Sequence, residues 1–138
     1  MADTVTSQTI QDGDKIAVLK FTNASDGTGE SAVKKVDVSA LSSNSLGQSC
    51  TSVSIARIYW ACVGMRVNIE FDASTNVLAI PLPADSTGDE YYDLFSGIPN
   101  NAGSGKTGDI DFTTVVHSDG DAYSIILVLN KIYEYVKL

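Results

Sequence analysis

The sequence predicts an all-β fold: a single-domain antiparallel β-sandwich or β-barrel, jelly-roll-like, with about eight or nine strands. The clearest pattern is Val63–Phe71, where apolar residues alternate with Gly64, Arg66, Asn68 and Glu70. Successive side chains of a strand point to opposite faces, so this order makes one face apolar and the other polar. Similar segments recur between evenly spaced turn signals, and none has helical periodicity. A half-buried strand needs apolar cover, which a second sheet supplies.

The sequence of the first part of the chain predicts an N-terminal arm or edge strand followed by two further strands. Residues 1–10 are polar and rich in Thr and Ser, and they are expected to be an N-terminal arm or a loosely held edge strand. Lys15–Thr22 is expected to be a strand that is apolar on both faces. The glycine-containing segment Asn23–Ser31 is expected to be a loop, because it has no large apolar residue. Ala32–Val38 then returns to strand character.

The sequence of the middle of the chain predicts a serine-rich loop followed by a strand with an irregularity. Serines dominate Ser39–Ser49, so this segment is expected to be a loop, with a short helical turn possible around Ser39–Leu41. Thr51–Trp60 is expected to be a strand in which the apolar face changes near Ala56 and Arg57. Such a change indicates a β-bulge or a bend between sheets.

After the Val63–Phe71 strand, the pattern becomes less regular. Val77–Leu82 is expected to be a strand that Pro81 and Pro83 either end or confine to a sheet edge, because proline donates no ladder hydrogen bond. Ala84–Asp89 is polar and is expected to be a loop before the aromatic segment Tyr91–Phe95. Ser96–Gly108 contains four glycines and is expected to be a long irregular loop, a kind of segment that often carries function.

The sequence of the last part of the chain predicts the most apolar of the expected strands. Asp109–His117 is expected to be a strand, and Asp119–Asp121 to be a hairpin turn before the next one. Ala122–Asn130 is expected to be a strand buried on both faces, because nearly all of its central residues are apolar. Lys131–Leu138 either continues this strand or forms a short terminal one.

Size and charge limit the possible functions. The 138 residues, taken as one domain over 1–138, suffice for a core without disulfides, so Cys50 and Cys62 are expected to be free, buried thiols. Nine basic against seventeen acidic residues give a formal net charge of −8. This charge argues against binding to nucleic acid or to an anionic membrane. The sequence shows no secretory signal and no membrane-spanning apolar run, so we expect synthesis in a cytoplasm.

No segment predicts a catalytic site. Gly103–Gly108 ends like a phosphate-binding loop, but Asn100 stands where that motif needs its first glycine, and strand character follows instead of a helix. His117 is the only histidine, and no nucleophile motif accompanies it. Asp109 and Asp111 are expected to form a solvated acidic stripe rather than a calcium site. We therefore expect no enzymatic activity, no cofactor and no metal.

Several segments resemble small virion proteins of tailed bacteriophages. The likeness lies in Ser25–Glu30, Lys34–Leu41, Gly64–Ala73 and Gly108–Thr114, and it extends over most of the chain. Proteins of this kind are rich in β-structure, and some are decoration or cement proteins on the capsid shell. The resemblance implies a structural protein that is synthesised in the bacterial host cytoplasm and lies on the capsid surface of the virion. It further implies binding to the major capsid protein and a homotrimer. It supplies no functional residues to transfer.

The expected contact regions are the two segments that are least able to form stable structure by themselves. They are the arm Ala2–Ile10 and the loop Ser96–Gly108. The residues predicted to bind the partner are Val5, Ile10, Ile98, Asn100, Asn101 and Lys106.

Two other roles stay open at this point. The first is a tail-tube, head–tail joining or fibre-associated subunit of the particle. The second is a carbohydrate-binding β-sandwich that uses Trp60, Tyr91 and Tyr92, although Tyr91 and Tyr92 with Phe95 could equally pack under the long loop.

Overall fold

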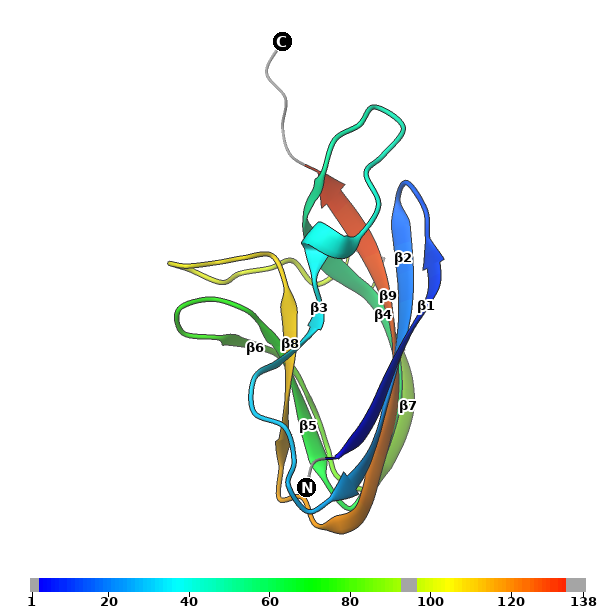
Figure 1. The fold of residues 1–138 in the computed structure, drawn as a ribbon, viewed down its shortest axis with the longest axis vertical. Coiled ribbons are helices and arrows are strands. Elements are labelled where there is room, and N and C mark those ends of the chain that lie inside the picture. The colour runs from blue at the N-terminus through cyan, green and yellow to red at the C-terminus, as the bar shows by residue number, and fades with distance from the viewer. Residues whose placement is uncertain (1–2, 93–96, 134–138) are drawn as a thin grey trace.

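The computed structural model describes residues 3–92 and 97–133, which form two facing antiparallel β-sheets (Figure 1). Over these residues the structure has nine strands and one short 3-10 helix, η1 (Val38–Ala40). The strands are β1 (Thr4–Asp12), β2 (Ile16–Asp26), β3 (Val33–Val36), β4 (Cys50–Val63), β5 (Arg66–Phe71), β6 (Val77–Leu82), β7 (Ser86–Tyr91), β8 (Ile110–Val115) and β9 (Asp119–Tyr133).

The strands pair in a nested order. β2 pairs with β9, β3 with β8, β4 with β7 and β5 with β6, all antiparallel. The pairings β4–β9 and β5–β8 join these pairs into two sheets, and β1 extends one of them. The five-stranded sheet has the order β1-β2-β9-β4-β7, and the four-stranded sheet the order β3-β8-β5-β6. This is the strand order of a jelly roll. The predicted sandwich is confirmed; in the described residues both sheets keep free edges, so the alternative of a closed barrel is not the fold.

The core lies between the inner faces of the two sheets. From β5 it receives Val67, Ile69 and Phe71, each at most 1% exposed. Across from them lie alternate residues of β9, from Tyr123 to Leu129. Phe112 joins the two layers through edge-to-face contacts with Phe21 and Tyr123, whose ring centroids lie 5.3 and 5.8 Å away. Burial of each such side chain contributes about 1.5–3 kcal/mol to folding.

Several predicted local features are confirmed. The register of β4 shifts between Ile55 and Arg57, which is the predicted irregularity. β6, with Pro81, forms an edge of the four-stranded sheet. The 3-10 helix η1 lies where a short helical turn was considered. Of the two forms considered for the N-terminal segment, Thr4–Asp12 adopts the edge strand.

The predicted start of the central strand is wrong. Val63 is the last residue of β4 and is 59% exposed, whereas β5 begins at Arg66. The turn between them needs Gly64, whose φ is +81° and whose N–H donates to an Asp85 carboxylate oxygen at 2.8 Å. A side chain at this position would collide with Asp121. Perfect alternation along a sequence therefore does not exclude a tight turn within it.

The loop predicted at Asn23–Ser31 begins later than expected, because β2 continues to Asp26. Asn23 is only 2% exposed, and its side-chain amide donates to Glu30 at 2.9 Å. Glu30 also accepts a hydrogen bond from Tyr123 at 2.6 Å and pairs with Lys35 at 2.5 Å. Polar residues thus continue the inward face of β2, since each finds a partner there.

Two other predictions are wrong for topological reasons. The segment Ala84–Asp89, expected to be a loop, contains most of β7, which pairs with β4. Gly88 is suited to this strand because the Trp60 ring lies where a side chain would be. Asp119–Asp121 does not close a hairpin, because β8 and β9 belong to different sheets and the intervening residues cross between them.

Candidate functional site: the outer face of the five-stranded sheet

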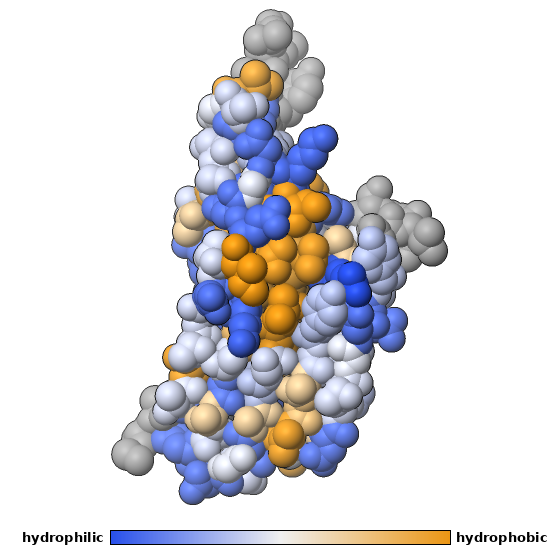
Figure 2. Space-filling view, turned by 90° about the vertical axis from the view of Figure 1, so that its right-hand side faces the viewer, coloured by the Kyte–Doolittle hydropathy of each residue, from blue (hydrophilic) through white to orange (hydrophobic). Residues whose placement is uncertain are grey.

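The outer face of the five-stranded sheet carries an apolar strip. Register places Val18 opposite Val128, and Ile126 between Lys20 and Tyr59, so these side chains share the face turned away from the core. Figure 2 shows hydrophobic surface along the middle of this face. We define the apolar strip as the outward apolar residues of β2 and β9: Ile16, Val18, Ile126, Val128 and Ile132.

The strip contradicts the prediction that Ala122–Asn130 is buried on both faces. Leu127 and Leu129 on the inner face are 0% exposed, but Ile126 and Val128 are only partly buried. Ile16 and Ile132 remain 38% and 45% exposed. A sheet in a two-layer sandwich has cover on one side only, so the sequence carries more apolar surface than the fold buries.

An arginine held between two tyrosines lies beside the strip. Arg57 faces outward because of the β4 bulge, and it makes a two-point ion pair with Asp89 through distances of 2.9 and 2.7 Å. Its guanidinium lies 4.6 Å from the centre of the Tyr59 ring and 5.0 Å from that of Tyr91. The hydrogen bonds with Asp89 raise the pKa of Arg57 and lower that of Asp89. The group is therefore charged and fixed in orientation.

A shallow hollow of about 490 Å³ adjoins this arginine. It forms because the small residues Ala61 and Ser124 face each other across β4 and β9, next to the larger pair Tyr59 and Ile126. The hollow is lined by Tyr59, Trp60, Ala61, Thr87, Gly88, Asp89, Ser124 and Ile126. It offers an aromatic wall, hydroxyl groups and a carboxylate on one surface.

The outer face of the five-stranded sheet carries little charge. Around the apolar strip, its outward strand positions contain two cations, Lys20 and Arg57, and one anion, Asp89, while two further acids, Asp26 and Asp119, pair at one end of β2 and β9. The whole chain has a formal net charge of −8. Because interface centres are depleted of charged residues, this face is the one best suited to burial against a partner.

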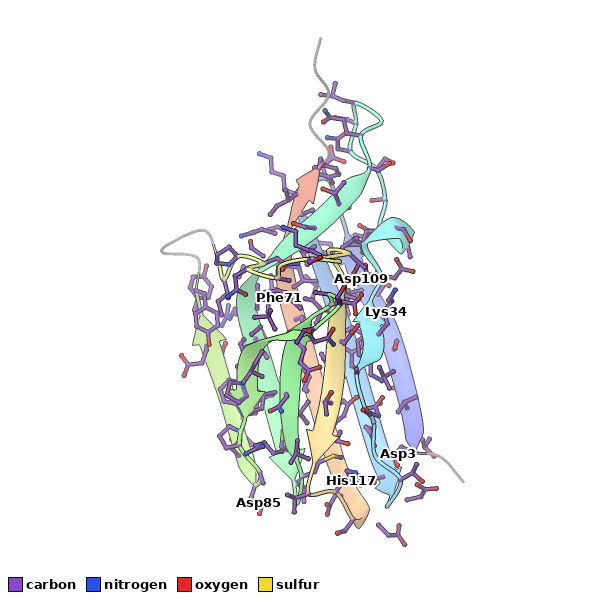
Figure 3. All side chains as sticks on the ribbon, turned by 90° about the vertical axis from the view of Figure 1, so that its left-hand side faces the viewer. Asp3, Lys34, Phe71, Asp85, Asp109 and His117 are labelled. Carbon is purple, nitrogen blue, oxygen red and sulfur yellow. The ribbon has the colours of Figure 1, made fainter. Side chains whose placement is uncertain are left out.

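The outer face of the four-stranded sheet is polar and internally hydrogen-bonded. Asp109, next to Lys34 in Figure 3, accepts from the Val38 N–H at 2.8 Å and pairs with Lys34 at 2.8 Å. Asp111 accepts from Asn76 at 2.9 Å. Asp109 and Asp111 are only 4% and 2% exposed, so the predicted solvated acidic stripe is wrong. These carboxylates are structural groups that hold neighbouring turns.

The pKa values of this polar face reflect burial. Burial, together with the hydrogen bond that the protonated Asp111 carboxyl donates to the neighbouring Asp72 carboxylate, raises the pKa of Asp111 to about 6. The same hydrogen bond lowers the pKa of Asp72. Asp72 also accepts from the Thr107 hydroxyl at 2.7 Å, which fixes the long loop to the turn after β5.

The predicted partner-binding residues fall into two separate groups. Val5 and Ile10 lie on the edge strand β1 and are 45% and 51% exposed. Ile98 instead pairs with Ile55 of β4, with N–H to O distances of 2.8 and 3.0 Å, and packs against the core. In the same loop, the Asn100 side chain accepts from the Ala102 N–H at 2.9 Å, and Asn101 and Lys106 are exposed. The structure does not bring the two groups together, and their binding roles stay predictions.

The three aromatic residues considered for carbohydrate binding do not share a face. Tyr91 lies on the outer face with Arg57, whereas Tyr92 packs against the core. Trp60 also packs against the core, and its indole N–H donates to Ser86 at 3.0 Å. Phe95 lies outside the described residues.

The outward residues Val18, Ile126 and Val128 were missed as candidate binding residues. The sequence did contain a signal for them, because two of the predicted strands carry apolar residues on both faces.

Other chemical sites find little support in the described part of the chain. Gly103–Gly108 leads into strand β8 instead of a helix, so it lacks the geometry of a phosphate-binding loop. Cys50 and Cys62 are free and buried, as predicted, and burial raises the pKa of Cys62 to about 11. Residues 3–92 and 97–133 contain no group of three or more His, Cys, Asp or Glu residues arranged to hold a metal ion. Within the same ranges, no helix has the length and apolar character to cross a membrane.

The chain was compared with models of protein families, with curated proteins and with solved structures, and no match was found in any of the three.

Proposed function

We propose that this chain is a structural, non-enzymatic protein of a tailed-bacteriophage particle: a capsid decoration protein that stabilises the head by binding the major capsid protein. The observation that carries the proposal is the apolar, nearly uncharged outer face of the five-stranded sheet on an otherwise acidic jelly roll. An apolar surface of this kind marks an interaction site in a folded protein.

The rest of the molecule supports a binding role. The core is fully packed between two sheets, so the outer face is presented by a rigid layer. Arg57 is already oriented by Asp89 and two tyrosines, which reduces the entropy lost when a partner covers it. The resemblance of the sequence to phage virion proteins supplies the class of partner and implies a homotrimer on the capsid surface.

The proposal is tested by locating the protein on the particle. Purified particles of the phage that encodes the chain would be labelled with a gold-conjugated antibody against it and imaged by electron microscopy. Labels distributed over the icosahedral shell are expected. Labels confined to the tail or its fibres would replace the decoration role by a tail-tube, head–tail joining or fibre role, and unlabelled particles would reject a virion role.

The hollow beside Tyr59 favours a second function, which is carbohydrate binding. Its aromatic wall and the side-chain oxygens of Thr87, Asp89 and Ser124 are groups that sugars contact. Of the predicted trio of Trp60, Tyr91 and Tyr92, only Trp60 lines this hollow. A glycan array with the purified protein tests it: specific hits that disappear in Tyr59→Ala support this function, and the absence of hits rejects it.

A further inference from the structure

The four free sheet edges are not equally protected against pairing with another chain. β3 has only four residues, of which Lys34 and Lys35 are charged, and β6 contains Pro81. β7 carries the consecutive acids Asp89 and Glu90. Short strands, charges and proline are the devices by which folded proteins prevent strand addition at an edge. Three of the four edges in the described structure therefore have such a device.

The fourth edge, β1, lacks them over most of its length. It has nine residues, and Thr4–Gln11 contains neither charge nor proline. The only irregularity is a bulge between Thr9 and Gln11, which leaves Thr4–Thr9 as a regular run. Six residues is the common length of a strand in a sheet. All of Thr4–Gln11 is exposed, so no described part of the chain covers this edge.

β1 is also held rigidly at both ends. At one end, Asp3 accepts hydrogen bonds from the Asn23 side chain at 3.0 Å and from the Gly29 N–H at 3.1 Å. At the other end, Asp12 accepts from the Lys131 ammonium at 2.6 Å and from the Ser42 N–H at 2.7 Å. The edge is thus fixed in strand conformation before any partner arrives, which lowers the entropy lost on pairing.

The position of β1 adds room for a partner. The five-stranded sheet extends one strand beyond the four-stranded sheet, and Figure 3 shows β1 as the outermost strand, outside β3. Val5, on the inward side of β1, is 45% exposed because no strand lies opposite it. Both faces of an added strand would therefore be accessible.

From these observations we infer that Thr4–Thr9 of β1 accepts an extended segment of the shell protein as a sixth strand of the sheet. This inference rests on the proposed decoration role and specifies how the contact forms. Main-chain hydrogen bonds would supply affinity, and the adjoining apolar strip would lie against the same partner. A second copy of this chain fits less well, because antiparallel pairing of two β1 strands is two-fold and closes a dimer instead of the proposed homotrimer, and the other three free edges are protected.

The test uses two proline variants of the full chain, Ser7→Pro and Gln8→Pro. The N–H groups of consecutive residues in an antiparallel strand point to opposite sides. One proline therefore removes a hydrogen bond to β2, and the other removes only an N–H at the free edge, where proline is tolerated. The variant with the smaller loss in Tm identifies the edge-facing position. Leu78→Lys, on the edge strand β6, serves as the control.

Binding is measured with fluorescently labelled protein and particles from a phage strain that lacks it. We expect the edge-facing proline variant to bind at least about tenfold more weakly than the wild type, with Leu78→Lys unchanged. Hydrogen exchange of the wild type on particles is the second measurement. We expect the edge-facing amides of Thr4–Thr9, which do not bond to β2, to be protected on the particle and not in the free protein. This readout remains valid if both proline variants unfold.

The outcomes separate the inference from the proposed function. Wild-type protein that does not bind particles overturns both. Wild-type protein that binds while the edge-facing proline variant binds equally well, or while the edge-facing amides of Thr4–Thr9 stay unprotected, overturns only the strand-addition inference. Protection of these amides in a dimer of the free protein, seen by sedimentation, also overturns it, because the occupant would then be a second copy.

Discussion

The two outer faces of the sandwich use their side chains in opposite ways. On the four-stranded sheet, Asp109 and Asp111 are buried under hydrogen bonds to neighbouring turns. On the five-stranded sheet, Ile126 and Val128 stand partly exposed with no described layer above them. The first face stabilises its own fold, and the second presents surface that a partner can bury. Stability and binding should therefore respond to substitutions on different faces.

The largest expected effect is on the stability of the four-stranded sheet. Asp109→Ala would leave the buried Val38 N–H without an acceptor and should lower the free energy of unfolding by about 2–3 kcal/mol. Asp109→Asn keeps a side-chain acceptor and should lower it less. Urea denaturation followed by circular dichroism measures both. Equal stability of the alanine variant and the wild type would mean that this polar face is not structural.

A smaller effect is expected on binding by the five-stranded sheet. Val128→Asp puts a charge into the apolar strip and should weaken particle binding about thirtyfold, equivalent to about 2 kcal/mol. Because Val128 is only partly buried, the variant should lose about 1 kcal/mol of stability or less. Arg66→Asp, at an exposed position on the opposite outer face, is the control. Equal particle binding by Val128→Asp and Arg66→Asp would contradict the assignment of binding to the five-stranded sheet.

The pH response should come from the four-stranded sheet. Between the unfolded pKa of Asp111, 3.8, and its folded pKa of about 6, the folded state holds a proton that the unfolded state has released. The free energy of unfolding contributed by this group therefore falls as the pH rises through that window. Asp111→Asn should be about 1–2 kcal/mol more stable than the wild type at pH 7.5 and closer to it at pH 4.5.

Urea denaturation at these two pH values checks this prediction. Asp14→Asn, at an exposed position, is the matched control. A stability difference that is the same at both pH values would show that Asp111 does not titrate in this window.

The smallest effect should follow from Arg57→Lys. Lysine keeps the charge but loses the two-point contact with Asp89 and the stacking on Tyr59 and Tyr91. The ion pair is substantially exposed, so Tm should stay within measurement error. Particle binding should weaken about twofold to threefold, because the cation is less well oriented. Lys20→Arg on the same face is the control, and identical binding by all three proteins would exclude Arg57 from the contact.

Strand alternation predicted much of the fold but not how the strands meet. The bulge near Arg57 and the edge position of Pro81 follow from local chemistry, so the sequence predicted both. β7 was missed because its residues are polar, and its only requirement is backbone pairing with β4. The role of Asp109 was also missed, since its partners Lys34 and Val38 are about seventy residues away in the chain.

The amino-acid order by itself determined that this chain is built from strands, because a two-residue side-chain period and the chemistry of turns act over a few residues. It also placed apolar residues on both faces of Ala122–Asn130. Only the tertiary structure decided which of those faces became core, since that depends on nested pairings between distant strands. The same pairings left Ile126 and Val128 on an open outer face and β1 at an unprotected edge, where we place the function.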